Sequence, residues 1–262
     1  MVDVRTKNER FNVLGTGVSI TNMPDTLATL EEWVAAGTKH YVCVTGVHGV
    51  MESYNDPELM EIHNASGLTV PDGMPLVWAG KIYGNKQMGR VYGPELMLAA
   101  CRLSVARKFT HFLYGGRAGV AQKVKENLEK RFPGIAIVGT FTPPFRALNA
   151  QEQEDLIGQV AACRPDFFWV GLSTPKQERF MSDYLPRLET RVMLGVGAAF
   201  DIHAGLFNDP PDWIKTSGMQ WFYRLCQDPR RLSKRYLTHN PVFIRKFLKQ
   251  LLTDVLKGGI RV

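Results

Sequence analysis

The sequence predicts an α/β protein built on a mostly parallel sheet. Short apolar runs that resemble β-strands alternate with segments of helical periodicity from residue 12 to residue 196. Strands that are separated by helices of about ten residues or more require right-handed crossovers, which leave neighbouring strands parallel. With 262 residues, 45% of them hydrophobic, the chain can form one large domain, or one domain with a terminal appendage.

In the first half of the chain, three apolar runs predict strands, over residues 12–18, 41–45 and 68–70. The segment 24–36 begins with Pro-Asp, has helical periodicity and stops at Gly37, so it is predicted as a helix. Further helices are predicted over residues 49–65, 74–83 and 94–107.

The second half shows the same alternation more clearly. The predicted strands cover residues 110–114, 135–138, 166–172 and 191–196. A glycine-rich turn at residues 115–119 follows the first of them. Helices are predicted over residues 120–132, 150–163, 175–185 and 242–256.

Positive charge is concentrated near the C-terminus. The whole chain carries 32 basic and 25 acidic residues, whereas residues 215–262 alone carry eleven basic and two acidic residues. An Asn-Asp-Pro-Pro sequence interrupts the periodic pattern just before this segment. We therefore predict an α/β domain over residues 1–207 and a basic helical appendage over residues 208–262 with an anionic partner.

Several classes of protein are excluded by simple features. No run of eighteen apolar residues is present, so no membrane-spanning helix is expected. Residues 1–10 are polar and charged, unlike a secretory signal. Four cysteines, none in a CxxC pair, are expected to be reduced and mostly buried, without a zinc site.

Residues that follow the strands are the first place to look for a ligand site. Open parallel sheets bind ligands beyond the carboxyl ends of their strands. In this chain these loops are rich in small and polar residues, which suits approach to a phosphate at a helix N-terminus. The loops match neither G-x-G-x-x-G nor the P-loop, so the sequence does not support nucleotide binding by either fingerprint.

Asp72 stands between a predicted strand and a predicted helix, and it allows two interpretations. An aspartate there can cap the helix by accepting hydrogen bonds from its first amides. It can equally serve as a general base that takes a proton from a substrate hydroxyl. The two interpretations are compatible.

The segment Thr174-Pro175-Lys176-Gln177 has the form of a helix capping box, with proline at the first helical position. Lys176 has no part in such a box. Because a lysine in the first turn opposes the helix dipole, it points either to a bound anion or to a neighbouring carboxylate.

Arg90 and His48 are further candidates. Arg90 is either a solvated arginine or a clamp for a diphosphate, which suits the planar guanidinium group. His48 is interpreted as a hydrogen-bonded histidine at a strand end. No second histidine, cysteine or carboxylate is recognised near it at metal-binding spacing, so no metal ion is expected.

The basic C-terminal segment has two parts. Residues 213–236 interleave aromatic residues with arginines, which is typical of nucleic-acid binding and also of a membrane interface. Residues 242–256 form an amphipathic pattern whose apolar stripe includes Phe243 and Phe247, with Arg245, Lys246 and Lys249 outside it. Such a helix either lies on an anionic membrane or packs on the protein core.

Seven motifs, in this order along residues 11–240, resemble the WecG/TagA/CpsF family of bacterial glycosyltransferases. They are Val-Pro-Asp-Gly-Met at 70–74, Arg-Val-Tyr-Gly-Pro-Glu-Leu at 90–96, Tyr-Gly-Gly-Arg-Ala-Gly at 114–119, Val-Gly-Leu-Ser-Thr-Pro-Lys-Gln-Glu at 170–178, Gly-Val-Gly-Ala-Ala-Phe-Asp-Ile-His-Ala-Gly at 195–205, Trp-Phe-Tyr-Arg-Leu at 221–225 and Asp-Pro-Arg-Arg-Leu at 228–232.

The resemblance implies a Rossmann-like sheet with helices on both faces and a membrane-associating C-terminal appendage. It also implies inverting transfer from a UDP-sugar to a glycan on polyprenyl diphosphate, without a metal ion or other cofactor. Such a reaction serves exopolysaccharide or cell-envelope synthesis at the cytoplasmic face of the membrane. The partners expected are therefore the UDP-sugar donor, the lipid-linked acceptor and an anionic membrane surface, together with self-association and no nucleic acid.

The resemblance also assigns roles to residues. Asp72 matches the family's proposed catalytic base, and the substrate-binding candidates are Thr45, His48, Arg90, Gly116, Lys176, Gln177, Asp201, Arg224, Arg231 and Arg235. Arginines of the C-terminal segment would contact the UDP diphosphate, because without a metal ion cationic side chains must stabilise the leaving group. Two other hypotheses stay open, namely a nucleic-acid-binding protein that uses the basic aromatic segment and a non-catalytic protein that keeps only the fold.

Overall fold

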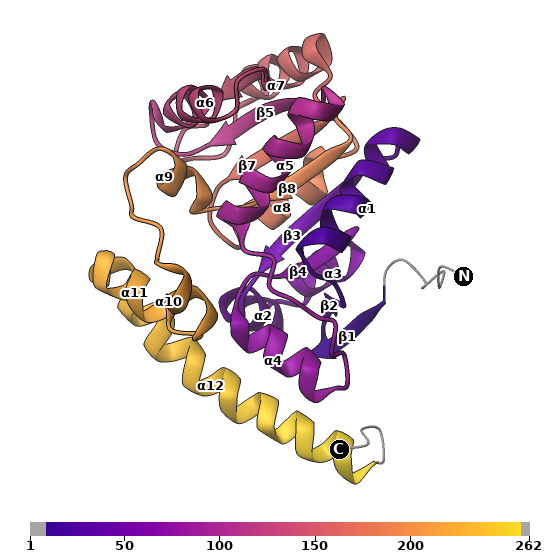
Figure 1. Cartoon of the computed structure of the whole chain (residues 1–262), viewed down its shortest axis with the longest axis vertical. Helices are drawn as coiled ribbons and strands as arrows, with labels where there is room; N and C mark the ends of the chain where they lie inside the picture. Colours follow the sequence, from indigo (N-terminus) through magenta and orange to yellow (C-terminus); the bar gives the residue numbers. More distant parts are fainter. Residues whose placement is uncertain (1–8, 258–262) are drawn as a thin grey trace. The chain divides into compact units, whose positions relative to one another are not determined.

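The computed structural model describes residues 9–257 of the chain (Figure 1). Contacts between residues group the chain into two compact units. Unit 1 comprises residues 1–26, 44–92 and 209–262, and unit 2 comprises residues 27–43 and 93–208. The predicted boundary between residues 207 and 208 stays a prediction, and the expectation about residues 1–10 falls mostly outside the described residues.

The larger sheet has six strands in the order β4-β3-β8-β7-β5-β6. The pairs β3–β8, β8–β7, β7–β5 and β5–β6 are all parallel. The predicted α/β fold with a mostly parallel sheet is therefore confirmed. The strands are β3 (His40–Thr45), β4 (Leu68–Pro71), β5 (Thr110–Gly115), β6 (Ala136–Phe141), β7 (Phe167–Gly171) and β8 (Val192–Gly195).

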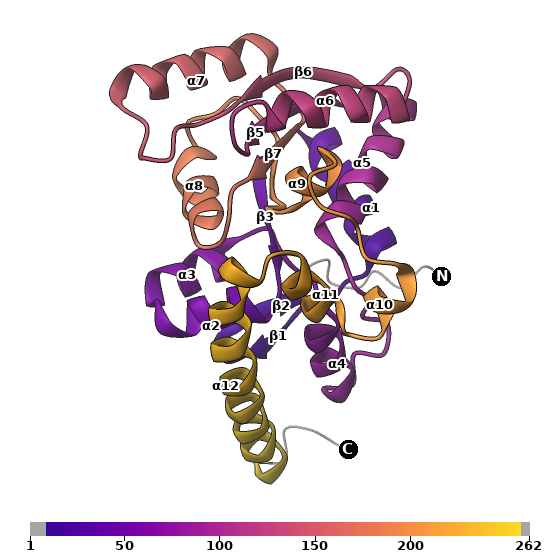
Figure 2. The same ribbon diagram turned by 90° about the vertical axis from the view of Figure 1, so that its left-hand side faces the viewer.

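The strands of unit 2 are apolar because helices cover both of their faces. Phe167, Phe168, Trp169 and Val170 of β7 are completely buried, as is usual in a parallel sheet. Figure 2 shows α8 on one side of these strands and α5 and α9 on the other. The helices that belong mainly to this unit are α1 (Met23–Ala36), α5 (Gly93–Arg107), α6 (Val120–Arg131), α7 (Ala150–Cys163), α8 (Lys176–Tyr184) and α9 (Ala199–His203).

The single strand predicted over residues 12–18 was wrong. The segment forms a hairpin of two antiparallel strands, β1 (Arg10–Val13) and β2 (Thr16–Ser19). Leu14 and Gly15 connect them with φ angles of 53° and 95°. Positive φ at both central residues is the geometry of a tight hairpin turn. Leucine rarely adopts it, so a turn at Leu14 was difficult to predict.

The single helix predicted over residues 49–65 was also wrong. It is divided into α2 (Val47–Asn55) and α3 (Pro57–Ala65). The side chain of Asp56 accepts a hydrogen bond from the backbone amide of Leu59 and caps α3, with Pro57 at its first position. An Asp-Pro pair therefore ends one helix and starts the next.

The C-terminal helix is longer than predicted. α12 extends over Pro229–Leu256 and contains Pro241, whose missing amide removes one backbone hydrogen bond inside the helix. Unit 1 also contains α4 (Met74–Ile82), α10 (Asp212–Thr216) and α11 (Gln220–Gln227).

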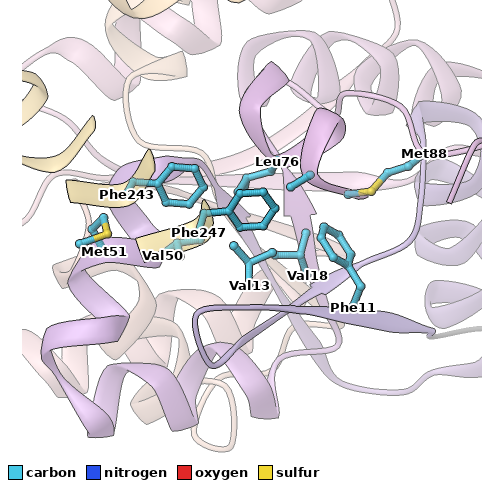
Figure 3. Close-up of a cluster of buried hydrophobic side chains, with 10 residues drawn as sticks. Phe11, Val13, Val18, Val50, Met51, Leu76, Met88, Phe243 and Phe247 are labelled. Atoms are coloured by element: carbon cyan, nitrogen blue, oxygen red, sulfur yellow. The ribbon is translucent and has the colours of Figure 1, made fainter. Parts of the chain in front are cut away.

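Two phenylalanines dock α12 in the core of unit 1. Figure 3 shows Phe243 and Phe247 among side chains of the N-terminal hairpin, α2 and α4, including Val13, Val50 and Leu76. Phe243 and Phe247 are only 5% and 8% exposed. A different face of the same helix carries exposed apolar residues, namely Ile244, Leu248, Leu252 and Val255. The helix therefore packs on the core and also presents an apolar surface.

The four cysteines are all free. Cys43 and Cys101 are buried as predicted, whereas Cys163 is half-buried and Cys226 is exposed. Burial raises the pKa of the Cys101 thiol to about 12, so this side chain is an inert part of the core.

Acid is expected to destabilise the protein through His111. Burial lowers the pKa of His111 to about 3, and its Nδ1 accepts a hydrogen bond of 2.9 Å from the indole of Trp169. The unfolded chain binds a proton near pH 6.5, but the folded chain does not until about pH 3. The free energy of unfolding should therefore fall by about 1.4 kcal/mol per pH unit as the pH drops through this range.

Denaturant unfolding between pH 7 and pH 4 tests this expectation when the wild type is compared with His111→Gln, which can still accept the bond from the indole. The variant should show a shallower loss of stability on acidification. Equal slopes in the two proteins would show that His111 does not contribute.

Candidate functional site

The candidate residues fall into two groups, one in each unit. The carboxyl ends of parallel strands lie at one edge of a sheet, and the loops that follow them carry most of these residues. Unit 1 contains Thr45, His48, Asp72, Arg90, Arg224, Arg231 and Arg235, and unit 2 contains Gly116, Lys176, Gln177 and Asp201.

Asp72 directly follows β4 and is half-buried. Its backbone amide donates a 2.9 Å hydrogen bond to the carbonyl of Thr45 at the end of β3. The interpretation of Asp72 as the cap of the next helix was wrong. The N-cap of α4 is Gly73, which has extended backbone angles, and no side chain caps this helix end. Asp72 therefore precedes the cap position of α4.

The side chain of Thr45 is hydrogen-bonded to a buried histidine. Its hydroxyl lies 3.1 Å from Nε2 of His63, and Nδ1 of the same ring lies 3.0 Å from both the Leu59 carbonyl and the Ser53 hydroxyl. Thr45 is 2% exposed and His63 is completely buried. This network fixes the end of β3 beside Asp72. Nothing local in the sequence pointed to His63, because the fold alone brings it to Thr45, 18 residues earlier in the chain.

Tyr92 is the centre of the polar cluster in unit 1. Burial raises the pKa of its phenol strongly, and the negative charges of Asp209 and Asp72 raise it further, whereas the charge of Arg224 lowers it. The phenol donates a 3.1 Å hydrogen bond to Asp209. The charges of Asp72 and Arg224 therefore both influence the pKa of the Tyr92 phenol. Tyr92 was missed as a candidate, although it stands within the Arg-Val-Tyr-Gly-Pro motif.

Arg90 lies over the ring of Tyr92, with its guanidinium carbon 4.8 Å from the ring centroid. Its Nη1 donates hydrogen bonds to the side-chain oxygen of Gln220, at 2.8 Å, and to the carbonyl of Lys215, at 3.4 Å. The C-terminal segment thus orients Arg90. The sequence suggested the guanidinium group but not this attachment.

Lys215 adds a further positive charge to the cluster. Its Nζ lies 2.7 Å from Asp209 and 3.3 Å from Asp212, and 5.9 Å from the centroid of the Tyr92 ring. The lysine is 7% exposed. A lysine this deeply buried requires its carboxylate partners, because an isolated buried charge is very costly. Three basic side chains therefore gather around one phenol, namely Arg90, Lys215 and Arg224.

Arg231 and Arg235 lie on α12, and the structure does not describe their side chains. Their predicted contacts with a diphosphate therefore stay predictions. The backbone places both residues in the helix turns that follow α11, which carries Arg224.

In unit 2, Gln177 and Glu178 form a buried polar pair at the start of α8. The Gln177 amide donates hydrogen bonds to Glu178, at 3.0 Å, and to the carbonyl of Gly195, at 3.2 Å. Among the described residues, the amide oxygen of Gln177 and Oε2 of Glu178 have no hydrogen-bond partner, although both side chains are almost completely buried. Buried polar atoms are rarely left in this state, so both indicate where a ligand or water would donate a hydrogen bond.

The predicted capping box at this helix start was wrong. The Thr174 hydroxyl donates a 2.9 Å hydrogen bond to Glu178, and the N-cap of α8 is Pro175 without a side-chain cap. Glu178 was missed as a candidate although it ends the Pro-Lys-Gln-Glu motif. Its burial on a helix whose first residue, Lys176, is exposed could not be inferred from the motif alone.

Glycines keep the space around Gln177 open. A Cβ atom on Gly197 would lie 3.3 Å from the Gln177 amide oxygen and 2.9 Å from the Leu172 carbonyl. Gly116 follows β5 with a φ of 74°, and a Cβ atom there would lie 2.7 Å from Val120. Asp201 is half-buried on the short helix α9. The glycines are thus required by the loops that follow β5 and β8.

His48 belongs to a cluster that the sequence analysis did not find. Its Nδ1 lies 2.9 Å from Nδ1 of His239 on α12 and 3.6 Å from Oε1 of Glu52. The statement that no carboxylate or histidine stands near His48 at metal-binding spacing was wrong. Glu52 lies one helical turn later on α2, and the fold brings His239 to the same place.

Comparison with known proteins identifies the family. The model of the glycosyl transferase WecG/TagA/CpsF family matches residues 11–256. A Bacillus subtilis (strain 168) protein named N-acetylglucosaminyldiphosphoundecaprenol N-acetyl-beta-D-mannosaminyltransferase is 25% identical over 222 residues, or 81% of this chain and 84% of that protein. The enzyme of the same name from Staphylococcus aureus (strain MRSA252) is 23% identical over 250 residues, which cover 95% of this chain and 96% of that protein. The chain belongs to the WecG/TagA/CpsF family of glycosyltransferases.

Proposed function

We propose that this glycosyltransferase moves a sugar from a UDP-sugar to a glycan carried on polyprenyl diphosphate and inverts the anomeric centre. The names of the relatives support N-acetylmannosamine as the sugar and N-acetylglucosaminyl-diphosphoundecaprenol as the acceptor. The observation that carries the proposal is the cluster around Tyr92. There the charges of Asp72, which follows strand β4, and of Arg224, in the C-terminal segment, both influence the pKa of the same phenol. The product would serve synthesis of exopolysaccharide or another envelope polymer.

In the first half of the reaction, Asp72 takes the proton of the acceptor hydroxyl. The oxygen then attacks the anomeric carbon from the face opposite the nucleotide, so a new glycosidic bond forms as the bond to the UDP oxygen breaks. Asp72 suits this role because it is half-buried directly after a strand, in the loop before Gly73, the N-cap of α4. A positioned general base contributes about 10²–10⁴-fold to a rate.

In the second half, negative charge develops on the departing diphosphate. Arg90 and Arg224 bring positive charge to the cluster around Tyr92 and would hold this leaving group, beside Lys215, which is paired with Asp209 and Asp212. Charge-assisted hydrogen bonds to a diphosphate are among the strongest that a protein makes. On this basis the transfer step is proposed to need no metal ion.

The buried amide of Gln177 would bind the donor substrate. Its oxygen has no partner among the described residues and lies beside Gly197, so it can accept a hydrogen bond from an N–H or O–H group of the nucleotide sugar. Lys176, Gly116 and Asp201 stay predicted contributors to the same binding function.

A thermal-shift series with UDP-sugars tests donor binding. A ligand that binds only the folded state raises its stability by RT ln(1 + [L]/Kd), so a donor at about 100 times its Kd adds about 2.7 kcal/mol. UDP-N-acetylmannosamine should raise the melting temperature more than UDP alone or UDP-glucose. Equal shifts with GDP-linked sugars, or none with any UDP-sugar, would contradict the proposal.

We propose further that α12 attaches the protein to the inner face of the cytoplasmic membrane. No helix among the described residues is both long and apolar enough to span a bilayer. The exposed apolar side chains Ile244, Leu248 and Leu252 lie on the same helix as Arg245 and Lys249. A helix with this combination binds anionic membranes through apolar burial and electrostatic attraction.

Replacing Leu248 and Leu252 together by glutamate should weaken binding to vesicles that contain phosphatidylglycerol by at least about tenfold, because each buried methylene group contributes about 0.8 kcal/mol. Both leucines are at least half exposed, so the fold should tolerate the change. Truncation of the helix is a poorer test, since it would also remove Phe243 and Phe247 from the core.

A matched control is the pair Val105→Glu and Phe145→Glu, which makes the same change of charge at exposed apolar positions of unit 2. Vesicle sedimentation should give wild-type affinity for this control. If both double variants lose affinity equally, net charge rather than the face of α12 accounts for binding.

Membership of the glycosyltransferase family favours the hypothesis of a sugar-transferring enzyme over the two other hypotheses. These are a nucleic-acid-binding protein and a non-catalytic protein with the same fold. The C-terminal segment also has a role within unit 1, where the side chain of Gln220 and the backbone carbonyl of Lys215 accept hydrogen bonds from Arg90.

A further inference from the structure

Three side chains from two helices meet on unit 1, apart from the cluster around Tyr92. His48 and Glu52 are one turn apart on α2, and His239 comes from α12, 191 residues further along the chain than His48. All three are half-buried, with side chains 14%, 32% and 18% exposed respectively. The group therefore lies where α12 packs on α2.

The imidazole rings of His48 and His239 meet through one nitrogen of each ring. Their nearest nitrogens, both Nδ1, are 2.9 Å apart, their centroids are 5.0 Å apart, and their planes differ by 18°. One ring must therefore donate a proton that the other accepts. Such a shared proton occupies the position that a metal ion takes between two imidazole ligands.

The carboxylate completes a set of three ligands. Oε1 of Glu52 lies 3.6 Å from Nδ1 of His48 and 3.8 Å from Nε2 of His239, and both separations are longer than a hydrogen bond. Ligand atoms about 2.0–2.2 Å from a tetrahedral ion are about 3.3–3.5 Å from one another. The distances from Nδ1 of His48 to Nδ1 of His239, 2.9 Å, and to Oε1 of Glu52, 3.6 Å, lie within about 0.4 Å of that range. One ligand atom from each of the three residues lies within 4.8 Å of the other two.

We propose that His48, Glu52 and His239 form a binding site for Zn²⁺ that joins α12 to α2. Two imidazoles and a carboxylate favour a transition metal over Mg²⁺ or Ca²⁺, which prefer oxygen ligands. The ion displaces the shared proton, and water occupies the fourth position.

The position of the site on α12 gives it a structural purpose. Pro241, two residues after His239, interrupts the backbone hydrogen bonds of the helix at this point. Phe243 and Phe247 anchor the part of α12 that follows Pro241. A metal ion at His239 anchors the part of α12 that precedes Pro241. This part begins at Pro229, shortly after the end of α11, the helix that carries Arg224.

Binding of Co²⁺, a spectroscopic substitute for Zn²⁺, tests the site directly. The full chain is used without an affinity tag and with Cys226→Ser, because Cys226 is an exposed thiol that can bind metals by itself. We expect one Co²⁺ per chain with the visible absorption of tetrahedral coordination, displaced by Zn²⁺, and a higher melting temperature with Zn²⁺ than without it.

Glu52→Gln and His239→Gln should each weaken Co²⁺ binding by at least about tenfold. His40→Gln is the matched control, because it removes a half-buried histidine from unit 2 and should leave binding unchanged. Circular dichroism without metal shows whether each variant folds. If His239→Gln does not fold, the Co²⁺ affinity of Glu52→Gln alone tests the proposal. Absence of Co²⁺ binding, or wild-type affinity in Glu52→Gln, overturns the proposal.

Discussion

Replacing Asp72 by asparagine is expected to lower kcat by about 10²–10⁴-fold, the usual contribution of a general base. Asparagine has nearly the same shape but cannot take a proton from the acceptor hydroxyl. The backbone bond from Asp72 to Thr45 does not depend on the side chain, and Gly73 rather than Asp72 is the N-cap of α4. The fold and the affinity for UDP should therefore stay close to those of the wild type.

Two measurements separate a lost base from a damaged fold. Transfer is followed as release of UDP with the lipid-linked acceptor, and UDP binding is followed by thermal shift. Asp56→Asn is a matched control, because asparagine caps a helix as well as aspartate and α3 should be unaffected. Wild-type kcat in Asp72→Asn would show that another group removes the proton.

Replacing Phe247 by alanine should destabilise the protein by about 3–5 kcal/mol, the usual cost of removing a buried phenylalanine. Its ring is 8% exposed, lies 5.8 Å from that of Phe243 and 6.2 Å from that of Tyr83, and packs in the core cluster of unit 1 (Figure 3). The loss would loosen α12, and with it the segment that orients Arg90.

Urea unfolding measures this effect, and Ile244→Ala on the same helix is the control. Ile244 is 57% exposed, so its truncation should change the free energy of unfolding by less than about 0.5 kcal/mol. If the two variants lose equal stability, α12 is not docked through Phe247 as the structure shows.

The α/β architecture could be predicted because its signals are local. The strand β7 is a continuous apolar run, and helix α7 was predicted with its observed bounds, Ala150–Cys163. A capping box, in which Asn149 and Glu152 each accept a bond from the other's backbone amide, starts that helix. Such short-range patterns survive in almost any tertiary context.

Errors arose where one local feature outweighed the general pattern. Residues 12–18 have the apolar character of one strand, yet Leu14 and Gly15 turn the chain. The periodicity of residues 49–65 suits one helix, but Asp56 and Pro57 divide it. In both cases two residues decide the backbone path, and the surrounding hydrophobic pattern does not reveal it.

Partners in the candidate site were the least predictable part. The motif around Arg90 pointed to a guanidinium group but not to Gln220, which holds it. His239 stands in a polar stretch, and only the packing of α12 on α2 brings it to His48. These contacts join residues more than a hundred positions apart, so no sequence periodicity contains them.

The most direct test of the proposed function is transfer itself. The purified chain is incubated with UDP-N-acetylmannosamine and N-acetylglucosaminyl-diphosphoundecaprenol, and the products are analysed by mass spectrometry and by NMR of the anomeric proton. We expect UDP and a lipid-linked disaccharide in equal amounts, with a β linkage formed by inversion of the α-linked donor. Release of UDP without disaccharide, or a disaccharide with retained α configuration, would contradict it.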